Sequence, residues 1–280
     1  MSQSANPLKN YFRHPALYIR LPSEGKFWPQ GSLEMPPNGE LGVMPMTAID
    51  EISYRTPDAL FNGDAVVRVV ESCVPDIKNA WHIPNIDLNT ILIAIRIASN
   101  GNDIDLGSKC PSCSTENTYG VNLRHVIDQL APGDYAEHIK HGDMEIYFKP
   151  MSYQDQNRIN LMQFEQQRLL QTVTQATGNE DERSKQLDQI LEEITKVTLQ
   201  AIKFSISAVR TPQDVVTDPA FIEEFLQNCD SKLFAQLRDH AVKLRTADDL
   251  KPLEIDCPEC KHHYKQDFIL DNALFFGSAS

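Results

Sequence analysis

The fold of this chain is decided by two short stretches, Lys109-Cys110-Pro111-Ser112-Cys113-Ser114 and Asp256-Cys257-Pro258-Glu259-Cys260-Lys261. Each is a Cys-Pro-x-Cys knuckle between two segments that read as strands, the second of which carries an aromatic residue. A tight turn at C-x-x-C directs two sulfurs to one centre, at about 2.3 Å from a tetrahedral zinc ion, and two facing turns close the shell. The pattern therefore predicts a zinc ribbon with one structural Zn²⁺. The four predicted ligands are Cys110, Cys113, Cys257 and Cys260.

The separation of the two knuckles in the sequence is unusual for a ribbon. Compact ribbons place the second pair about 15–20 residues after the first, whereas 143 residues lie between Cys113 and Cys257. Closing a long loop costs only logarithmically more free energy than closing a short one, so this gap is compatible with a shared site. We therefore expect a discontinuous zinc ribbon that brackets a helical insertion. A closed shell of four thiolates leaves no open position, which predicts a structural metal and not a catalytic one.

Three other interpretations of the cysteines stay open at this point. A redox-active C-x-x-C would sit at the start of a helix, but neither knuckle is followed by an apolar helical pattern. The two pairs could instead form separate half-sites, each completed by other residues. His262 and His263 directly follow Cys260 and could replace a thiolate or complete a second site. The remaining cysteines, Cys73 and Cys229, fall on apolar helical faces, which predicts unreactive core thiols.

The pattern of proline and apolar residues along the whole chain predicts an α+β protein with a β-rich N-terminal part and a helical core. Its first segment is rich in proline, whereas apolar residues recur at helical spacing in two later segments. The expected divisions are an extended N-terminal arm and hairpin at 1–50, a helical core segment at 51–101, a zinc-ribbon and β region at 102–150 with 247–280, and a helical insertion at 151–246.

Two features of the N-terminal segment lead to specific expectations. Residues 33–35 and 41–44 flank the turn signal Pro36-Pro37-Asn38-Gly39, which predicts a hairpin. Residues 12–18 and 27–29 are rich in aromatic residues and proline. This arm either packs on the protein's own surface or extends to add to a sheet edge or groove of a neighbouring protein.

Helix signals follow in the core segment. Thr56-Pro57 predicts the start of a short helix, with a capping hydroxyl before a proline. From Val66 to Cys73, apolar side chains recur at i, i+3, i+4 and i+7, which is one face of a helix. Asp87 is expected to cap a third helix that ends at Asn100-Gly101. Because that helix is apolar almost all round, we expect it at the centre of the core.

The helical insertion shows a long apolar stripe. Apolar residues at helical spacing run from Leu187 to Ala208, and a second amphipathic segment precedes them, which together predict an antiparallel helical hairpin. Asp218-Pro219 predicts the start of another helix, and Asp230 or Ser231 the start of the last. Before the insertion, residues 137–148 predict a short β-hairpin.

Composition excludes several classes of protein. Of the 280 residues, 41% are apolar, which is enough to bury a core, and 39 acidic against 26 basic residues give a net charge of −13. A polyanion of this size is a poor non-specific ligand for nucleic acid or for an anionic membrane. There is no run of 18 apolar residues and no secretory signal, so we expect neither a membrane association nor export and place synthesis in the cytoplasm.

Signatures of catalysis are missing from the sequence. It contains no G-x-x-x-x-G-K-[ST], no G-x-G-x-x-G, no H-E-x-x-H and no G-x-S-x-G. Acidic residues are so plentiful that their presence alone is no evidence for acid–base chemistry. We therefore expect no catalytic residue and no enzymatic activity. Two alternatives remain, a nucleic-acid-associated zinc-ribbon module and an enzyme that uses unpaired acidic residues.

Several further segments of the chain share a pattern with a known family. They are Pro15-Ala16-Leu17-Tyr18-Ile19-Arg20-Leu21-Pro22-Ser23, Val43-Met44-Pro45-Met46-Thr47-Ala48-Ile49-Asp50-Glu51, Thr56-Pro57-Asp58-Ala59-Leu60-Phe61-Asn62-Gly63, Ile95-Arg96-Ile97-Ala98-Ser99-Asn100-Gly101, the first knuckle and Val121-Asn122-Leu123. With these segments the chain resembles the T4-type bacteriophage base plate protein family. The resemblance covers roughly residues 12–125 and, through the second knuckle, the C-terminal part.

The resemblance implies a part in building the baseplate of a contractile phage tail. The protein would be either a baseplate hub subunit of the virion or a hub assembly protein that leaves afterwards. Its partners would be other tail baseplate and hub proteins, with no nucleic acid and no membrane. It would be found in the host cytoplasm during assembly and, as a hub subunit, in the virion. The family brings no catalytic residues to this chain.

Overall fold

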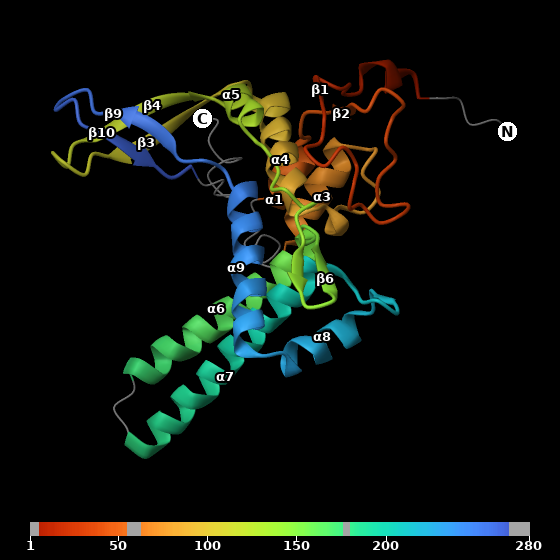
Figure 1. The fold of residues 1–280 in the computed structure, drawn as a ribbon. Coiled ribbons are helices and arrows are strands. Elements are labelled where there is room, and N and C mark those ends of the chain that lie inside the picture. Colours follow the sequence, from red (N-terminus) through yellow and green to blue (C-terminus); the bar gives the residue numbers. More distant parts are fainter. Residues whose placement is uncertain (1–5, 55–62, 176–179, 269–280) are drawn as a thin grey trace. The chain divides into compact units, whose positions relative to one another are not determined.

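The computed structural model describes residues 6–54, 63–175 and 180–268, and the chain forms two compact units (Figure 1). Unit 1 comprises Met1–Ala80, Asp87–Leu130 and Leu250–Ser280. Unit 2 comprises Trp81–Ile86 and Ala131–Asp249. Both units combine helices with small antiparallel sheets, so the predicted α+β class is confirmed.

Helices form the core of unit 1. They are α1 (Ala48–Tyr54), α3 (Asp64–Cys73) and α4 (Asn85–Asn100). The predicted apolar face of α3 is buried from Val66 to Cys73. In α4, Ile91, Ile93 and Ile95 have no exposed surface. Because residues two apart on a helix point to different sides, α4 is buried all round, as its composition predicts. The short helix predicted at Thr56-Pro57 lies outside the described residues.

The start of α4 differs from the prediction that Asp87 caps the helix. The helix begins two residues earlier, and Asp87 is fully buried in its first turn. Its carboxylate accepts hydrogen bonds from the Ser23 backbone N–H at 2.9 Å, the Ser23 hydroxyl at 2.5 Å and the Trp28 indole N–H at 2.8 Å. Burial raises the pKa of Asp87, and these hydrogen bonds oppose the increase. Asp87 therefore fastens the loop with Ser23 and Trp28 to the core.

The strand pairing of the N-terminal segment also differs from the predicted hairpin. The turn forms, with the Gly39 N–H donating to the Pro36 carbonyl at 2.9 Å and a φ of 71° at Gly39. However, β2 (Leu41–Val43) pairs antiparallel with β1 (Leu17–Ile19), and Leu33 makes only an isolated bridge to Ile77. Prolines lack the N–H that a strand ladder requires, so the segment before the turn does not continue as the partner of β2.

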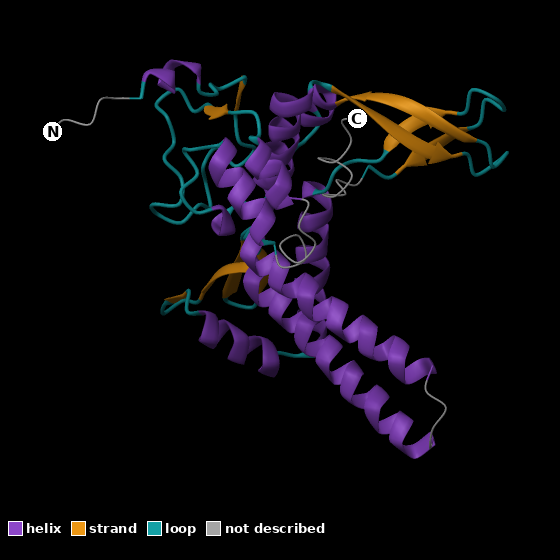
Figure 2. Ribbon diagram, turned by 180° about the vertical axis from the view of Figure 1, so that it is seen from behind, coloured by secondary structure: helices purple, strands orange, loops and turns teal. Residues whose placement is uncertain are grey.

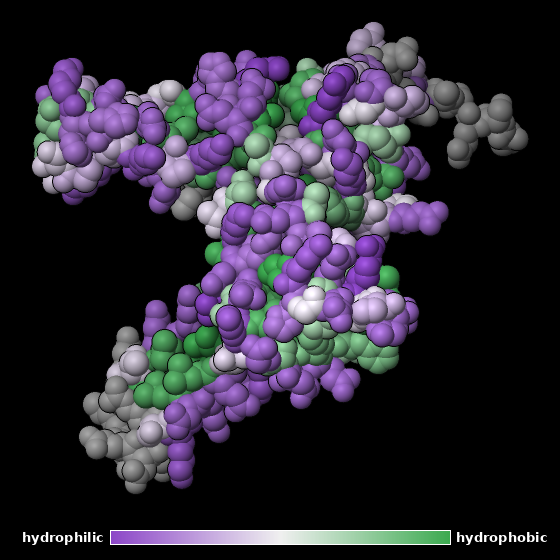
Figure 3. Space-filling view, viewed as in Figure 1, coloured by the Kyte–Doolittle hydropathy of each residue, from purple (hydrophilic) through white to green (hydrophobic). Residues whose placement is uncertain are grey.

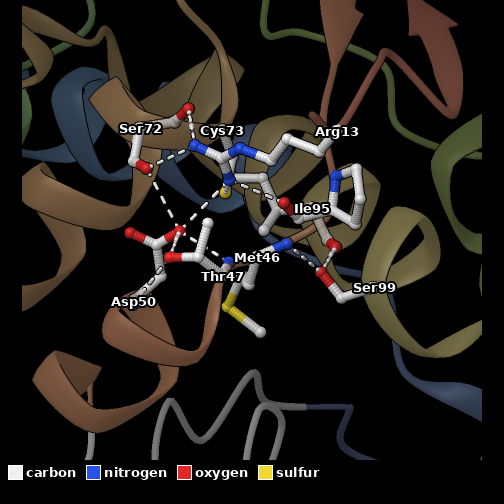
Figure 4. Close-up of polar contacts among 9 residues, drawn as sticks. Arg13, Met46, Thr47, Asp50, Ser72, Cys73, Ile95 and Ser99 are labelled. Atoms are coloured by element: carbon white, nitrogen blue, oxygen red, sulfur yellow. Dashed lines mark hydrogen bonds and ion pairs between the residues drawn. The ribbon is translucent and has the colours of Figure 1, made fainter. Parts of the chain in front are cut away.

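The N-terminal arm contacts its own unit through Arg13, whereas its aromatic side chains Phe12 and Tyr18 are exposed. After a short 3₁₀ helix, η1 (Pro7–Tyr11), Arg13 reaches into a polar cluster beside α1 and α3 (Figure 4). One guanidinium nitrogen donates to the Pro45 carbonyl at 2.6 Å and to Asp50 Oδ2 at 3.1 Å. The other donates to the backbone carbonyl and the hydroxyl of Ser72, both at 2.7 Å. One side chain thus joins the arm to both helices.

The same cluster surrounds Cys73. Its thiol has no exposed surface, and burial, with the nearby Asp50 carboxylate, raises its pKa to about 12. A thiol reacts through its thiolate, so a raised pKa makes Cys73 unreactive. This agrees with its prediction as a core thiol.

Two antiparallel hairpins carry the knuckles in unit 1. The first is β3 (Asp103–Lys109) with β4 (Glu116–Asn122), which leads into α5 (Leu123–Asp128). The second is β9 (Leu253–Asp256) with β10 (His263–Gln266). The predicted strands on both sides of each knuckle are therefore confirmed, and the two hairpins lie side by side (Figure 2).

Unit 2 contains a four-stranded antiparallel sheet of order β5-β6-β7-β8. Its strands are β5 (Ile139–His141), β6 (Met144–Phe148), β7 (Ile206–Arg210) and β8 (Val215–Val216). The hairpin β5–β6 was predicted. The strand β7 was not, because the apolar stripe of the preceding helix was expected to continue to Ala208. The helix ends at Ser205 instead, and Ala208 pairs with Tyr147 in the sheet.

The helices of unit 2 follow the predicted order. They are α6 (Tyr153–Gln175), α7 (Glu180–Ser205), α8 (Pro219–Asn228) and α9 (Ser231–Asp248), with η2 (Ala80–His82) before them in the chain. The predicted antiparallel pairing of α6 with α7 is confirmed (Figure 1). Asp218 and Asp230 cap α8 and α9 by accepting hydrogen bonds from backbone N–H groups of the first turn. None of the helices in the described residues has the length and apolar character needed to cross a bilayer.

We expect the substitution Asp87→Asn to lower the free energy of unfolding of unit 1 by about 1–3 kcal/mol. The amide nitrogen that replaces one carboxylate oxygen cannot accept the hydrogen bonds from the Ser23 hydroxyl and the Trp28 indole. Chemical denaturation followed by tryptophan fluorescence measures the change. The control is Asp105→Asn on the exposed face of β3, which should leave stability unchanged. Equal stability of both variants would contradict the role of Asp87.

Candidate metal centre

The first knuckle is a tight turn between β3 and β4. The backbone N–H of Cys110 donates to the Thr115 carbonyl at 3.0 Å, and the N–H of Ser114 donates to the Cys110 carbonyl at 2.9 Å. Ser114 has a φ of 60°, in the left-handed region that residues other than glycine seldom adopt. These two hydrogen bonds close the turn, so the chain reverses its direction over the knuckle.

The second knuckle has the same two backbone hydrogen bonds as the first. The N–H of Cys257 donates to the His262 carbonyl at 3.0 Å, and the N–H of Lys261 donates to the Cys257 carbonyl at 2.9 Å. Lys261, which corresponds to Ser114, has a φ of 58°. The same unusual conformation at the same place in two turns indicates that both are shaped for one purpose, the presentation of two sulfurs.

The four sulfurs of the two knuckles converge. Cys110 Sγ lies 3.7 Å from Cys260 Sγ, and Cys113 Sγ lies 3.6 Å from Cys257 Sγ. All four ligand atoms lie within 4.8 Å of one another. Sulfurs at about 2.3 Å from one tetrahedral ion are about 3.8 Å apart. Four cysteines that are far apart in the sequence are therefore spaced to hold one metal ion.

Burial alternates within the knuckles. The first cysteine of each, Cys110 and Cys257, is buried, whereas the second, Cys113 and Cys260, is exposed. The buried pair packs with Tyr264 in a small cluster. The Tyr264 hydroxyl lies 3.0 Å from the hydroxyl of Ser108 on the other hairpin. The two hairpins thus meet through the sulfurs, one aromatic ring and a few polar contacts.

Hydrogen bonds to the sulfurs favour their ionised form. The Thr115 hydroxyl lies 3.3 Å from Cys113 Sγ, and hydrogen bonds with the side chain and the backbone of Thr115 lower the pKa of Cys113 to about 6. The Asn117 side-chain amide donates to Cys257 Sγ at 3.7 Å. Such bonds orient metal ligands and stabilise thiolates. Sequence reasoning missed Thr115 and Asn117, because a polar residue after a knuckle is too common to be a signal.

The pKa of Cys260 moves in the opposite direction, to about 11. A backbone hydrogen bond from His262 lowers it, but desolvation and hydrogen bonds with the other three thiols raise it by more. One thiolate in a tight group disfavours a second one by charge repulsion. A divalent cation at the centre removes this repulsion, because its positive charge stabilises every thiolate at once.

The geometry favours one shared site over the other interpretations. Two separate half-sites do not fit four sulfurs within 4.8 Å. The ring of His262 stacks on Tyr264, and His263 Nδ1 lies 2.9 Å from Asp256 Oδ1, so neither histidine joins the cysteine cluster in the described part of the chain. Both knuckles lie between strands and not at the start of a helix, where a redox-active pair would be expected.

A family model described as T4 bacteriophage base plate protein matches residues 34–276. The chain belongs to this family. The match contains both knuckles and both helices of the α6–α7 hairpin, so it also extends over the helical middle, which lies outside the segments that carry the resemblance in the sequence. No curated protein and no solved structure matches the chain. The family relation therefore rests on the sequence pattern of the baseplate proteins.

We expect Cys257→Ser to lose the bound metal and to lower the stability of unit 1 by several kcal/mol, because the free energy of binding at a structural site contributes directly to folding. The second hairpin should then come free, which limited proteolysis would detect as faster cleavage near residue 250. Metal content is measured by inductively coupled plasma mass spectrometry. The control is Cys229→Ser, at a half-buried thiol of unit 2, which should keep its metal. Unchanged metal content in Cys257→Ser would mean that the ligand set is wrong.

Proposed function

We propose that this protein is a non-enzymatic structural or assembly protein of the baseplate hub in a contractile phage tail, acting through protein–protein contacts. Membership in the T4 baseplate family is the observation that supports the proposal. A baseplate is an assembly of proteins, so a part of it works through the surfaces that it presents. As a hub subunit the protein stays in the virion, whereas as an assembly factor it leaves after its work in the host cytoplasm.

We infer that the metal is zinc and that its role is structural. Its ligands are Cys110, Cys113, Cys257 and Cys260, and soft thiolates in a tetrahedral arrangement are typical of zinc. Four protein ligands complete the shell, so no position is left for a substrate or a catalytic water. The ion joins the hairpin in the middle of the chain to the hairpin near its end.

The surface of unit 2 agrees with a non-enzymatic role. A groove of about 780 Å³ lies along α6 and α7, lined by apolar, amide and hydroxyl side chains and by Glu192 and Glu193. Both carboxylates are exposed and pair with Lys196 at 3.0 and 2.8 Å. Exposed carboxylates that pair with a lysine one turn away are typical of a solvated helix surface.

The alternative of a nucleic-acid-associated ribbon has little support from charge. The two hairpins, at 103–122 and 253–266, contain six acidic and three basic residues. A surface that binds nucleic acid presents a basic stripe to the phosphates. Binding to DNA or RNA that weakens steeply with salt would revive this alternative.

We expect deletion of the gene from its phage to stop tail assembly, with the defect restored by the wild-type protein supplied in trans. Electron microscopy of lysates would show particles without complete baseplates. Quantitative mass spectrometry of purified virions then separates the two roles, because a hub subunit is present at a fixed number of copies per tail and an assembly factor is absent. Normal tails from the deletion phage would contradict both roles.

A further inference from the structure

The four cysteines of the candidate metal centre differ in their access to solvent. Cys113 and Cys260, the second cysteines of the two knuckles, are exposed, whereas Cys110 and Cys257 are buried. In Figure 3 most of the surface over the two hairpins is hydrophilic. A small polar reagent in the solvent therefore reaches one sulfur of each knuckle directly and finds the other sulfur covered.

The exposed and buried sulfurs form two pairs that cross between the hairpins. Cys113 Sγ lies 3.6 Å from Cys257 Sγ, and Cys110 Sγ lies 3.7 Å from Cys260 Sγ. Each pair thus joins the exposed sulfur of one knuckle to the buried sulfur of the other. The sulfurs of a disulfide are about 2.05 Å apart, so each pair has to close by about 1.6 Å, which is within the range of side-chain rotation.

We propose that these four thiols are a site of oxidation by peroxide, and that they close as two disulfides between the knuckles, Cys113–Cys257 and Cys110–Cys260. The two bonds take the place of the metal as the link between the hairpins. The inference rests on the structural metal site of the proposed function and adds what that site does when it meets an oxidant. It differs from a redox-active C-x-x-C, in which the two sulfurs of one motif pair with each other.

Each disulfide forms in two steps, of which the first takes place at an exposed sulfur. The thiolate of Cys113 attacks one peroxide oxygen, so an S–O bond forms, the O–O bond breaks and the hydroxide that leaves takes up a proton. The product at Cys113 is a sulfenic acid. The sulfur of Cys257 then attacks Cys113 Sγ, the S–O bond breaks, and the hydroxide leaves as water with the proton of Cys257.

The balance of this reaction is complete. Two thiols and one hydrogen peroxide give one disulfide and two waters, because the sulfurs lose two electrons and the peroxide gains them. Cys260 and Cys110 follow the same course with a second peroxide. A metal ligand has to be a thiolate, so the metal leaves as the disulfides form.

Charge around the site favours a small neutral oxidant. The two hairpins, at 103–122 and 253–266, contain six acidic and three basic residues. An anionic oxidant meets repulsion from a surface of this sign, whereas hydrogen peroxide carries no charge. Peroxide is therefore the class of oxidant that the site admits most readily.

Disulfides between the knuckles would fasten the same two segments that a shared metal fastens. Their cysteines are 144 residues apart in one pair and 150 in the other. Cross-links that close long loops restrict the unfolded chain most. A bond within one knuckle would instead close a loop of two residues and leave the hairpins unconnected.

The proposed function gives such a link a use. A protein of the virion leaves the reducing cytoplasm in which it was made, and disulfides persist outside that compartment. The crossing bonds would keep the ribbon closed there after the metal is lost.

Oxidation of the full, metal-loaded chain tests the proposal. Metal content and free thiols are measured before and after addition of about two hydrogen peroxide molecules per chain, the amount that two disulfides consume. The disulfides are then mapped by mass spectrometry of peptides prepared without reduction. We expect the crossing bonds Cys113–Cys257 and Cys110–Cys260, with one metal ion released for four thiols lost. Cys73, which has no exposed surface, should stay reduced.

Limited proteolysis near residue 250 shows whether the bonds hold the second hairpin in place. The oxidised chain should be cut within about twofold of the rate of the metal-loaded chain, because both hairpins stay linked. Reduction of the oxidised chain in the presence of a chelator should raise the rate at least about tenfold, since it removes both kinds of link.

Two matched double variants compare the pairs directly. Cys110→Ser, Cys260→Ser keeps one crossing pair, whereas Cys110→Ser, Cys113→Ser keeps only the two sulfurs of the second knuckle. The first should form its disulfide at least about tenfold faster at equal peroxide, because its sulfurs are held in contact. The map of the wild-type chain needs no substitution, so it decides the matter even where a variant fails to fold.

Two results would overturn the inference. One is a wild-type map with disulfides within the knuckles in place of the crossing bonds. The other is conversion of the exposed thiols to sulfinic acids without any disulfide. The metal content before oxidation separates this test from that of the proposed site, because a chain isolated without metal contradicts the zinc site while the map still decides the disulfides.

Discussion

The convergence of four sulfurs is the constraint on which the ribbon depends. Antiparallel two-stranded hairpins are marginally stable alone in water, and the shared core of these two consists of Cys110, Cys257 and Tyr264 with the partly buried Ile255. The strands otherwise alternate between exposed and half-buried residues over most of their length. So little buried apolar surface cannot balance the conformational entropy of ordering them. A metal bound by both knuckles, as proposed above, would supply the missing free energy.

This constraint explains how the ribbon tolerates a long insertion between its two knuckles. Residues Ala131–Asp249 form most of unit 2, and they lie in the sequence between the two knuckles of unit 1. The loop-closure cost of this arrangement grows only slowly with length. A shared metal would link the two halves of the ribbon without any requirement on unit 2 itself. Unit 2, with its own sheet and helices, is therefore free to vary without loss of the ribbon.

The sequence predicts the parts of this structure that follow from local chemistry. The knuckles, the buried faces of α3 and α4 and the capped starts of α8 and α9 are each specified by residues close together in the chain. The same holds for the residues of the candidate metal site, since cysteine spacing indicates both the turn and the ligand pair. The meeting of the two cysteine pairs follows from coordination number, because a closed tetrahedral zinc shell needs four ligands and each knuckle supplies two.

The predictions that fail depend on distant partners. β2 pairs with β1 across more than twenty residues, and no local pattern distinguishes that partner from the nearer one. Asp87 looks like a helix cap, but donors from Ser23 and Trp28 place it inside the core. The end of α7 was missed because a short apolar run satisfies helical and strand spacing equally well. Only pairing with β6 decides that β7 is a strand.

The central claim is that both knuckles hold one ion. X-ray absorption spectroscopy at the zinc edge, on protein with its metal content measured in parallel, tests it most directly. The account predicts one zinc per chain with four sulfur ligands at about 2.3 Å. Two zinc ions per chain, or a first shell that contains nitrogen or oxygen in place of sulfur, would contradict it.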